Sequence, residues 1–307
     1  MQWLEVSLTV SGEAAEAVAD VLTRFAPDGV ALEAARIEQS PDSETAQPAG
    51  DVIVRAYLEA GEGLETRRAQ LEEALWHLGQ LLPLPEPAYR PVAEADWAES
   101  WKANYQVVRV GRQLVIVPAW LDPALGSGDI AIRLDPGMAF GTGTHPSTQL
   151  CLKAIERHLA PGQRMLDIGT GSGILAIAAV KLGASRVLAL DIAPEAVRVT
   201  RENAAANDVA GGIEVTQASL PEVLRGDFGP EWLSTPLVVA NILASIITPM
   251  LEQGLADVVA PGGLLIVSGI LDTQAYRIIA ALETHGLILA AQEQSEDWVA
   301  FIARKPD

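Results

Sequence analysis

A turn in the middle of the sequence combines a carboxylate with closely spaced glycines, in the stretch Leu166-Asp-Ile-Gly-Thr-Gly-Ser-Gly173. Glycine turns that follow a strand often hold phosphate on backbone N–H groups at the start of a helix. Here Asp167 stands directly before the glycines, and a carboxylate beside a pyrophosphate would bring like charges together in a partly desolvated cleft. The turn therefore favours a ligand that is cationic where it meets Asp167.

Two cofactor classes fit this turn. The NAD-dependent oxidoreductase alternative stays open on pattern alone, because 171–176 matches G-x-G-x-x-G/A and Asp191 follows about 20 residues later. S-adenosyl-L-methionine, in contrast, has no phosphate, and its sulfonium and ammonium groups suit Asp167. Gly169 and Gly171 would let the backbone approach this cofactor. Asp191 would accept hydrogen bonds from the two ribose hydroxyls, or it would merely cap the following helix.

Asn241 follows an apolar run, at a strand end where an open α/β sheet presents its ligands. Methylation of an amine needs a free lone pair, and deprotonating a lysine at pH 7 costs about 4.6 kcal/mol. A carboxylate would keep the amine protonated. An amide oxygen instead accepts a hydrogen bond from the neutral amine and orients its lone pair. Asn241 resembles the first residue of the Asn/Asp-Pro-Pro-aromatic motif, although Ile242 and Leu243 replace the prolines. The alternative is a buried amide that ties down the strand end.

A second glycine-rich segment runs from Asp135 to His145, "DPGMAFGTGTH", directly before a helical pattern. Such a loop closes over a ligand in many enzymes. We expect Phe140 to supply an apolar lid, and Thr142 and Thr144 to supply hydroxyls for the methionyl end of the cofactor. His145 is expected to cap the helix rather than to act as a base. No metal site is expected anywhere in the chain.

Residues 105–307 alternate between strand and helix patterns, which predicts a parallel sheet with helices on both faces. The last two strand patterns, 287–294 and 297–304, are joined by a connection too short for a crossover helix, so they must pair antiparallel. A helix is predicted over 245–258. The predicted fold is a Rossmann-like class I methyltransferase domain, with a parallel sheet that ends in an antiparallel hairpin.

Residues 1–88 are predicted to form a small ferredoxin-like α+β domain with the order β-α-β-β-α-β, completed by a last short strand near 88–95. A polar tract over 40–50 separates two of its strands. A linker helix is predicted over 89–104, where Trp97 and Trp101 share one face and are expected to pack against a neighbouring domain. Since no catalytic constellation occurs here, we interpret 1–88 as a recognition or assembly module.

The 307 residues carry a net charge of −19, which argues against direct binding of nucleic acid. Residues 1–95 hold 17 acidic and 6 basic side chains, a net of −11, so this part either steers a basic substrate or is simply a solvated surface.

The N-terminus lacks a secretory pattern and the apolar runs are too short to span a bilayer. We expect a cytoplasmic protein without membrane contact. The only cysteine, Cys151, is expected to be buried and inert.

Several of these segments together resemble a known family: "DPGMAFGTGTHPST", "LDIGTGSGILAIAA", "ALDI", "NILA" and "SGIL" are similar to the ribosomal protein L-eleven methyltransferase family (PrmA). The resemblance is specific over 90–307, whereas over 1–85 only the inferred topology agrees. It implies S-adenosylmethionine-dependent methylation of lysine side chains and of the N-terminal amine of that basic ribosomal protein. It also implies that the N-terminal domain recognises the substrate. A methyltransferase for another protein or small molecule, and a binding protein without turnover, remain alternatives.

Overall fold

The computed structural model describes residues 2–23, 25–26, 30–34, 51–61, 63–80, 82–93, 106–134 and 143–307. The chain divides into two compact units, Met1–Tyr105 and Gln106–Asp307, and each is described by itself. The polar tract over 40–50, the pair Trp97 and Trp101, Phe140 and Thr142 all lie outside the described residues.

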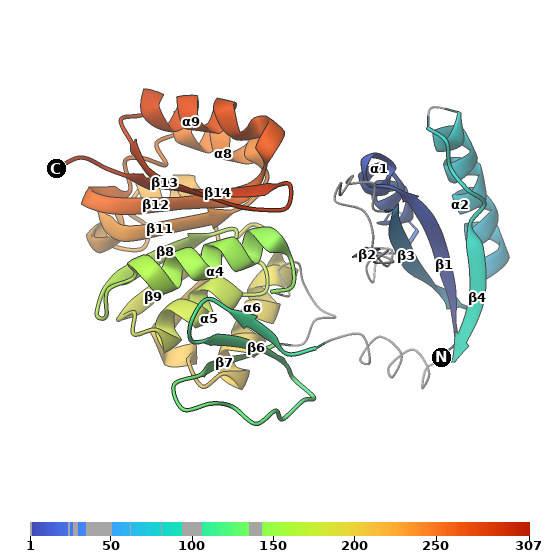
Figure 1. Ribbon diagram of the computed structural model, residues 1–307, viewed down its shortest axis with the longest axis horizontal. Helices are drawn as coiled ribbons and strands as arrows, with labels where there is room; N and C mark the ends of the chain where they lie inside the picture. The colour runs from blue at the N-terminus through green and yellow to red at the C-terminus, as the bar shows by residue number, and fades with distance from the viewer. Residues whose placement is uncertain are drawn as a thin grey trace, which may run out of the picture. The chain divides into compact units, whose positions relative to one another are not determined.

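In its described residues, the N-terminal unit consists of a four-stranded antiparallel sheet and two helices (Figure 1). Its strand order, β2-β3-β1-β4, confirms the ferredoxin-like prediction. The elements are β1 Gln2–Ser11, α1 Gly12–Thr23, β2 Val30–Ala34, β3 Asp51–Ala60, α2 Leu64–Gly79 and β4 Ala88–Ala93.

Alternation along β1 builds the core of this unit. Val6, Leu8 and Val10 are buried and share one face of the strand, where α1 and α2 contribute Val18, Leu22 and Leu71. The predicted boundary at residue 88 falls too early, because β4 continues its pairing with β1 as far as Ala93. The short strand predicted near 88–95 is confirmed, residues 89–93 are not part of a linker helix, and 94–104 lie outside the described residues.

The C-terminal unit contains a seven-stranded sheet in the order β10-β9-β8-β11-β12-β14-β13. The first five of these strands run parallel, and β14 is antiparallel to both neighbours, which confirms the predicted hairpin. The strands are β8 Arg164–Ile168, β9 Arg186–Asp191, β10 Ile213–Gln217, β11 Thr235–Asn241, β12 Val259–Leu271, β13 Ile288–Ser295 and β14 Trp298–Arg304.

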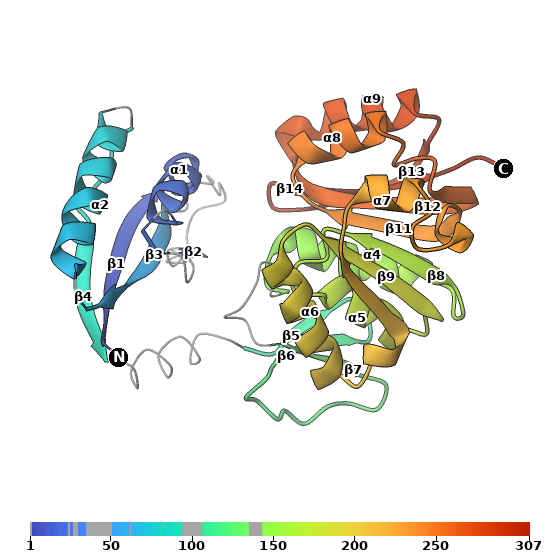
Figure 2. The same cartoon turned by 180° about the vertical axis from the view of Figure 1, so that it is seen from behind.

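Helices cover both faces of this sheet, and Figure 2 shows the two layers from behind. One face carries α4 Pro146–His158, α5 Ile174–Lys181 and α6 Pro194–Ala206, and the other carries α7 Leu220–Leu224, α8 Ala244–Glu252 and α9 Ala275–Thr284. A three-stranded sheet lies beside α5 and consists of β5 Val108–Val110, β6 Leu114–Pro118 and β7 Ile130–Leu134.

The helix predicted over 245–258 is shorter in the structure, since α8 ends at Glu252. Gly254 adopts a left-handed backbone (φ 106°), which an α-helix does not continue through. The apolar residues after this point, Leu255, Val258 and Val259, remain buried without helical geometry. Apolar spacing therefore predicted the burial of this segment correctly and its conformation wrongly.

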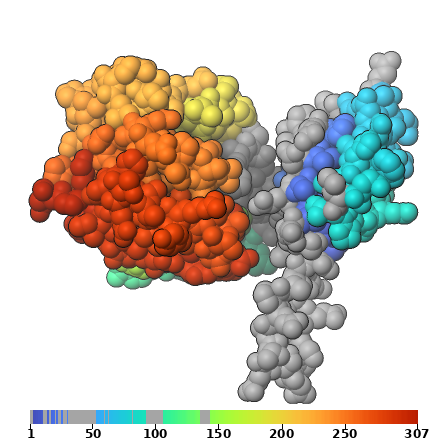
Figure 3. Space-filling model, turned by 90° about the horizontal axis from the view of Figure 1, so that it is seen from above, coloured from blue at the N-terminus to red at the C-terminus, as the bar shows by residue number. Residues whose placement is uncertain are grey.

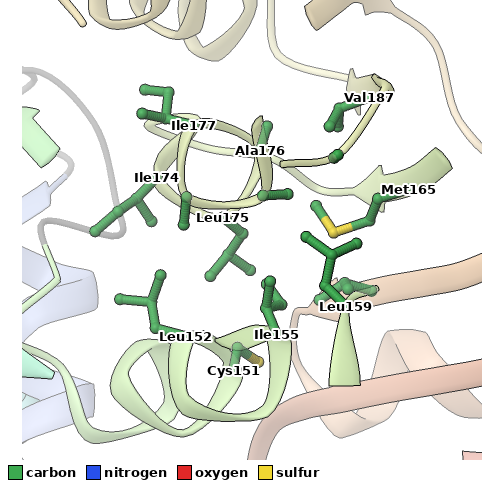
Figure 4. Close-up of a cluster of buried hydrophobic side chains, with 14 of the residues drawn as sticks. Cys151, Leu152, Ile155, Leu159, Met165, Ile174, Leu175, Ala176, Ile177 and Val187 are labelled. Atoms are coloured by element: carbon green, nitrogen blue, oxygen red, sulfur yellow. The ribbon is translucent and has the colours of Figure 1, made fainter. Parts of the chain in front are cut away.

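The core between α4 and the sheet confirms the prediction for the lone cysteine. Cys151 is fully buried among apolar side chains such as Leu152, Ile155 and Leu175 (Figure 4). Burial raises the pKa of its thiol well above the usual range. A thiol that is both inaccessible and protonated is a packing group rather than a nucleophile.

Candidate active site

The glycine turn lies between β8 and α5, at the carboxyl edge of the parallel strands. Gly169 and Gly173 both adopt left-handed backbone conformations, with φ of 76° and 81°. A Cβ added at Gly169 would lie 2.5 Å from Cγ2 of Ile242, and one at Gly173 would lie 2.7 Å from Cγ2 of Thr200. Only glycine therefore permits this path of the backbone across the strand ends.

Asp167 lies beneath the turn and has no solvent exposure. Its Oδ2 accepts a hydrogen bond from Oγ1 of Thr170 at 2.7 Å, whereas its Oδ1 is buried and has no partner among the described residues. Burial raises the pKa of this carboxyl to about 7, since a charge without solvent or a countercharge is disfavoured. The structure thus offers a buried acceptor whose ionised form a cation would stabilise.

Asp191 ends β9 and joins the turn to the next helix. Its Oδ2 accepts a hydrogen bond from the backbone N–H of Gly171 at 3.0 Å, and its Oδ1 accepts one from that of Ala193 at 3.0 Å. Asp191 therefore bonds a backbone N–H just before α6, as the alternative of a helix-capping role predicted in part. The N-cap residue itself is Ala193 and not Asp191. These backbone contacts fix the orientation of the carboxylate, and each of its oxygens can accept a further hydrogen bond.

Asn241 ends β11, the strand beside β8. Its Nδ2 donates to Oγ1 of Thr148 at 3.3 Å, while its Oδ1 is buried and has no partner among the described residues. The register pairs Val239 with Asp167, so Asn241 projects from the same face of the sheet as Asp167, one pleat further along. Two neighbouring strands thus present open acceptor oxygens towards the carboxyl edge.

The end of the glycine-rich loop is also described. The backbone carbonyl of Thr144 accepts a hydrogen bond from the side-chain amide of Gln149 at 3.0 Å. His145 is the N-cap residue of α4, and its Nδ1 accepts from the backbone N–H of Ser147 at 3.3 Å. Its ring also packs edge-on against Trp298, and burial lowers its pKa. The expected capping role of His145 is confirmed.

Two residues near these groups were not predicted from the sequence. Thr148 is fully buried in the first turn of α4 and holds the amide of Asn241. Ile192 follows Asp191 directly and is 74% exposed, an unusual environment for an isoleucine. Its place directly after a predicted ligand residue was a usable signal, whereas nothing in the sequence pairs Thr148 with Asn241.

Among the described residues, no group of three or more His, Cys, Asp or Glu side chains is arranged to hold a metal ion. Among these same parts of the chain, every helix is too short or too polar to cross a membrane.

The strand order, the antiparallel β14 and the acidic ends of β8 and β9 define a class I methyltransferase fold. Comparison with known proteins gives the family. The family described as ribosomal protein L11 methyltransferase (PrmA) matches residues 2–306, and the chain belongs to it. The resemblance inferred from the motifs is thereby confirmed, and it extends over the N-terminal unit as well.

Individual relatives agree over the full length. A ribosomal protein L11 methyltransferase of Chloroflexus aurantiacus is 44% identical, across 99% of this chain and 98% of that protein. One of Pelotomaculum thermopropionicum is 42% identical, across 99% of both. The crystal structure of a ribosomal protein L11 methylase from Lactobacillus delbrueckii subsp. bulgaricus aligns with a TM-score of 0.59 and 37% identity, covering 66% of this chain and all of that one.

Proposed function

We propose that this protein transfers methyl groups from S-adenosyl-L-methionine to amines of ribosomal protein L11, the lysine side chains and the N-terminal amine, in the cytoplasm. The observation that carries the proposal is the pair of open acceptors, Oδ1 of Asp167 and Oδ1 of Asn241, at the ends of adjacent strands. Buried oxygens without a donor cost free energy unless a ligand supplies one. An ammonium group and an acceptor amine are both donors.

The residues present fit S-adenosyl-L-methionine better than a dinucleotide. Asp191 would bind the ribose hydroxyls, with Ile192 as an apolar surface beside it for the base. Asp167 and the backbone at Gly169 and Gly171 would surround the cationic methionyl part. A pyrophosphate at this turn would instead meet a buried carboxyl with no countercharge among the described residues, which argues against the NAD alternative. When bound, the cofactor supplies an electrophilic methyl group.

The loop that precedes α4 completes this assignment. Phe140, Thr142 and Thr144 are proposed to cover the methionyl end of the cofactor, which excludes water from the reacting groups. Support comes from the position of Thr144, directly before His145 at the start of α4, the helix that also carries Thr148. The loop therefore leads into the same helix that holds the amide of Asn241.

Asn241 is proposed to act on the acceptor amine. Its Oδ1 would accept a hydrogen bond from the neutral amine, which directs the nitrogen lone pair towards the methyl group. Thr148 occupies Nδ2 and so leaves the oxygen, not the nitrogen, facing the acceptor. With the cofactor held by Asp167 and Asp191, the amine lone pair would form the N–C bond, the electrons of the S–C bond would remain on the cofactor, and the proton of the amine would pass to water.

The N-terminal ferredoxin-like unit is proposed to recognise the substrate protein. Its acidic composition suits a basic partner, because opposite charges speed encounter without fixing the bound geometry. If this charge steers the substrate, the apparent second-order rate constant falls as salt rises from low to physiological concentration. A rate constant independent of salt would show that the acidic residues do not steer the substrate and form only a solvated surface.

Mass spectrometry of purified ribosomal protein L11 after incubation with this protein and S-adenosyl-L-methionine tests the proposal. We expect successive gains of one methylene mass on lysine side chains and on the N-terminal amine. Asn241→Ala should abolish these gains, whereas Gln253→Ala, an exposed amide at the far end of α8, should not. If calorimetry shows cofactor binding but ribosomal protein L11 gains no mass, the cofactor assignment stands and ribosomal protein L11 is rejected as the substrate.

A further inference from the structure

An exposed apolar patch lies beside Asn241, at the start of α8 and α9. Leu243 is the N-cap residue of α8 and is 60% exposed, and Ile246, one turn further, is 47% exposed. Tyr276, the second residue of α9, is 83% exposed. The two helices pack together and follow the carboxyl ends of the adjacent strands β11 and β12, so their first turns lie at one edge of the sheet. Figure 3 shows how these helices and the closing strands, orange to red, form much of one face of the unit.

Carboxylates border this patch. Asp272 follows β12, and Glu296 and Asp297 form the turn between β13 and β14. A hydrogen bond from the backbone N–H of Asp272 to the carbonyl of Asp297, 2.9 Å, joins the two segments. All three side chains are exposed, and none forms an ion pair with another described residue. With Arg277 counted, the net formal charge of this border is −2.

The segment that carries Leu243 and Ile246 follows Asn241 directly in the chain. Ile242 links Asn241 to Leu243, and its backbone N–H donates to the carbonyl of Ser268 in β12 at 3.1 Å. At Gly269 a Cβ would lie 2.5 Å from the carbonyl oxygen of Ile242, so β12 supports this segment from below. Because the segment is fixed on β12, an acceptor bonded to Oδ1 of Asn241 would lie close to the exposed side chain of Leu243.

We propose that Leu243, Ile246 and Tyr276, with Asp272, Glu296 and Asp297, form an acceptor edge that docks a lysine-bearing cationic segment of the methyl-acceptor protein. This inference rests on the proposed function. A lysine presents an apolar four-carbon stem that ends in a charge, so a surface that is apolar at the reacting group and acidic around it matches both parts. Apolar residues exposed together beside a reactive group otherwise have no structural role in the fold.

Binding of ribosomal protein L11 to the cofactor-loaded protein tests the acceptor edge. The triple variant Asp272→Asn, Glu296→Gln, Asp297→Asn should weaken the Kd roughly fivefold to tenfold at low salt and by less at high salt. The matched control is Glu252→Gln, Asp257→Asn, Glu283→Gln. It makes the same change in net charge with three exposed carboxylates near the other ends of α8 and α9, and it should change the Kd less than twofold.

The apolar part is tested separately. Tyr276→Ser should weaken the Kd roughly threefold, whereas Ile288→Ser, which removes another exposed apolar side chain on β13, should leave it unchanged. The KM for ribosomal protein L11 should follow the Kd in both series, while kcat and the cofactor Kd stay constant. Equal Kd values for each variant and its control would overturn the acceptor edge.

Methylation by the unsubstituted protein separates this proposal from the proposed function. Methylation together with equal Kd values rejects only the acceptor edge. If ribosomal protein L11 binds but is not methylated, the proposed function is rejected. The comparison of Kd values then still tests the acceptor edge. If the protein neither binds nor methylates ribosomal protein L11, both proposals fail.

Discussion

The four-stranded and the seven-stranded sheet each carry a carboxylate that is almost inaccessible to solvent, Glu5 in β1 and Asp167 in β8. In the N-terminal sheet Glu5 is fully partnered. Its Oε1 pairs with Arg55 at 3.5 Å, and its Oε2 accepts from the hydroxyl of Tyr57 at 3.1 Å and from Arg90 at 3.3 Å. In the C-terminal sheet Asp167 has one side-chain partner, Thr170, and an open oxygen.

The difference supports a structural role for Glu5 and the proposed ligand-binding role for Asp167. A buried carboxylate that accepts from donors on two neighbouring strands links β1 to both of them. An oxygen left open in the folded protein costs free energy, which a bound donor would offset. Asn241 shares this property with Asp167, and both lie at the edge where α/β sheets bind ligands.

The largest effect is expected at Asn241. Asn241→Ala should lower kcat roughly a hundredfold or more, because the acceptor amine loses the group that orients its lone pair. The free energy of unfolding should fall by only about 1 kcal/mol, because the hydrogen bond from Nδ2 to Thr148 is lost while the amide oxygen has no partner to lose within the described residues. Single-turnover methylation and urea denaturation measure the two quantities. A kcat within threefold of the original would show that the open oxygen does not serve the reaction.

A smaller effect is expected at Asp191. Asp191→Ala should weaken cofactor binding by about tenfold to a hundredfold for each charged hydrogen bond lost, since such a bond contributes roughly 1.5–3 kcal/mol. Calorimetric titration gives the dissociation constant, with the exposed Asp257→Ala as the control. Because Asp191 also holds the N–H groups of Gly171 and Ala193, the melting temperature must be compared as well. An unchanged affinity would remove Asp191 from the site.

The open oxygen of Asp167 predicts a dependence on pH. Burial raises the pKa of this carboxyl to about 7, and a cation bound beside it would lower that pKa, so binding releases a proton. Affinity for S-adenosyl-L-methionine should therefore rise roughly tenfold between about pH 6 and 8. Asp167→Asn should remove this rise and report only the titration of the cofactor itself. Identical pH profiles for the two proteins would contradict the assignment.

In the protein without ligand, the raised pKa of Asp167 also determines how the free energy of unfolding changes with pH. The folded protein keeps the proton of Asp167 between about pH 4 and 7, a range in which the unfolded chain has released it. The contribution of this carboxyl to the free energy of unfolding is therefore full below about pH 4 and is lost as pH rises towards 7. Urea denaturation across this range should show a decline that is absent in Asp167→Asn.

The smallest effect on the methyl transfer reaction is expected from substitution of Glu5. Glu5→Ala should lower the free energy of unfolding of the N-terminal unit by about 1–3 kcal/mol, since hydrogen bonds to a nearly buried carboxylate are lost. Cofactor affinity should not change. Hydrogen exchange along β1 locates the loss, and Thr9→Ala, an exposed position on the same strand, is the control. If the cofactor affinity fell with Glu5→Ala, the contrast between a structural and a functional carboxylate would be wrong.

Much of the site could be predicted because its signals are local in the chain. The glycines around Gly169 need left-handed backbone conformations, and strand ends such as Asp191 and Asn241 follow from apolar runs that stop at a polar residue. The capping role of His145 depends only on residues within one turn. The end of α8 was mispredicted because apolar spacing continues past Gly254, although the backbone there leaves the helix.

The sequence by itself determined the succession of strands and helices along the chain, the antiparallel hairpin and the chemical types at the strand ends, since these follow from periodicity and from turn residues. Only the tertiary structure decided which polar atoms have partners. Asn241 and Thr148 are 93 residues apart along the chain, yet their hydrogen bond leaves the amide oxygen open. The burial that raises the pKa of Asp167 likewise depends on α4 and on the neighbouring strands. Contacts of this kind form between segments far apart in the chain, and no local pattern encodes them.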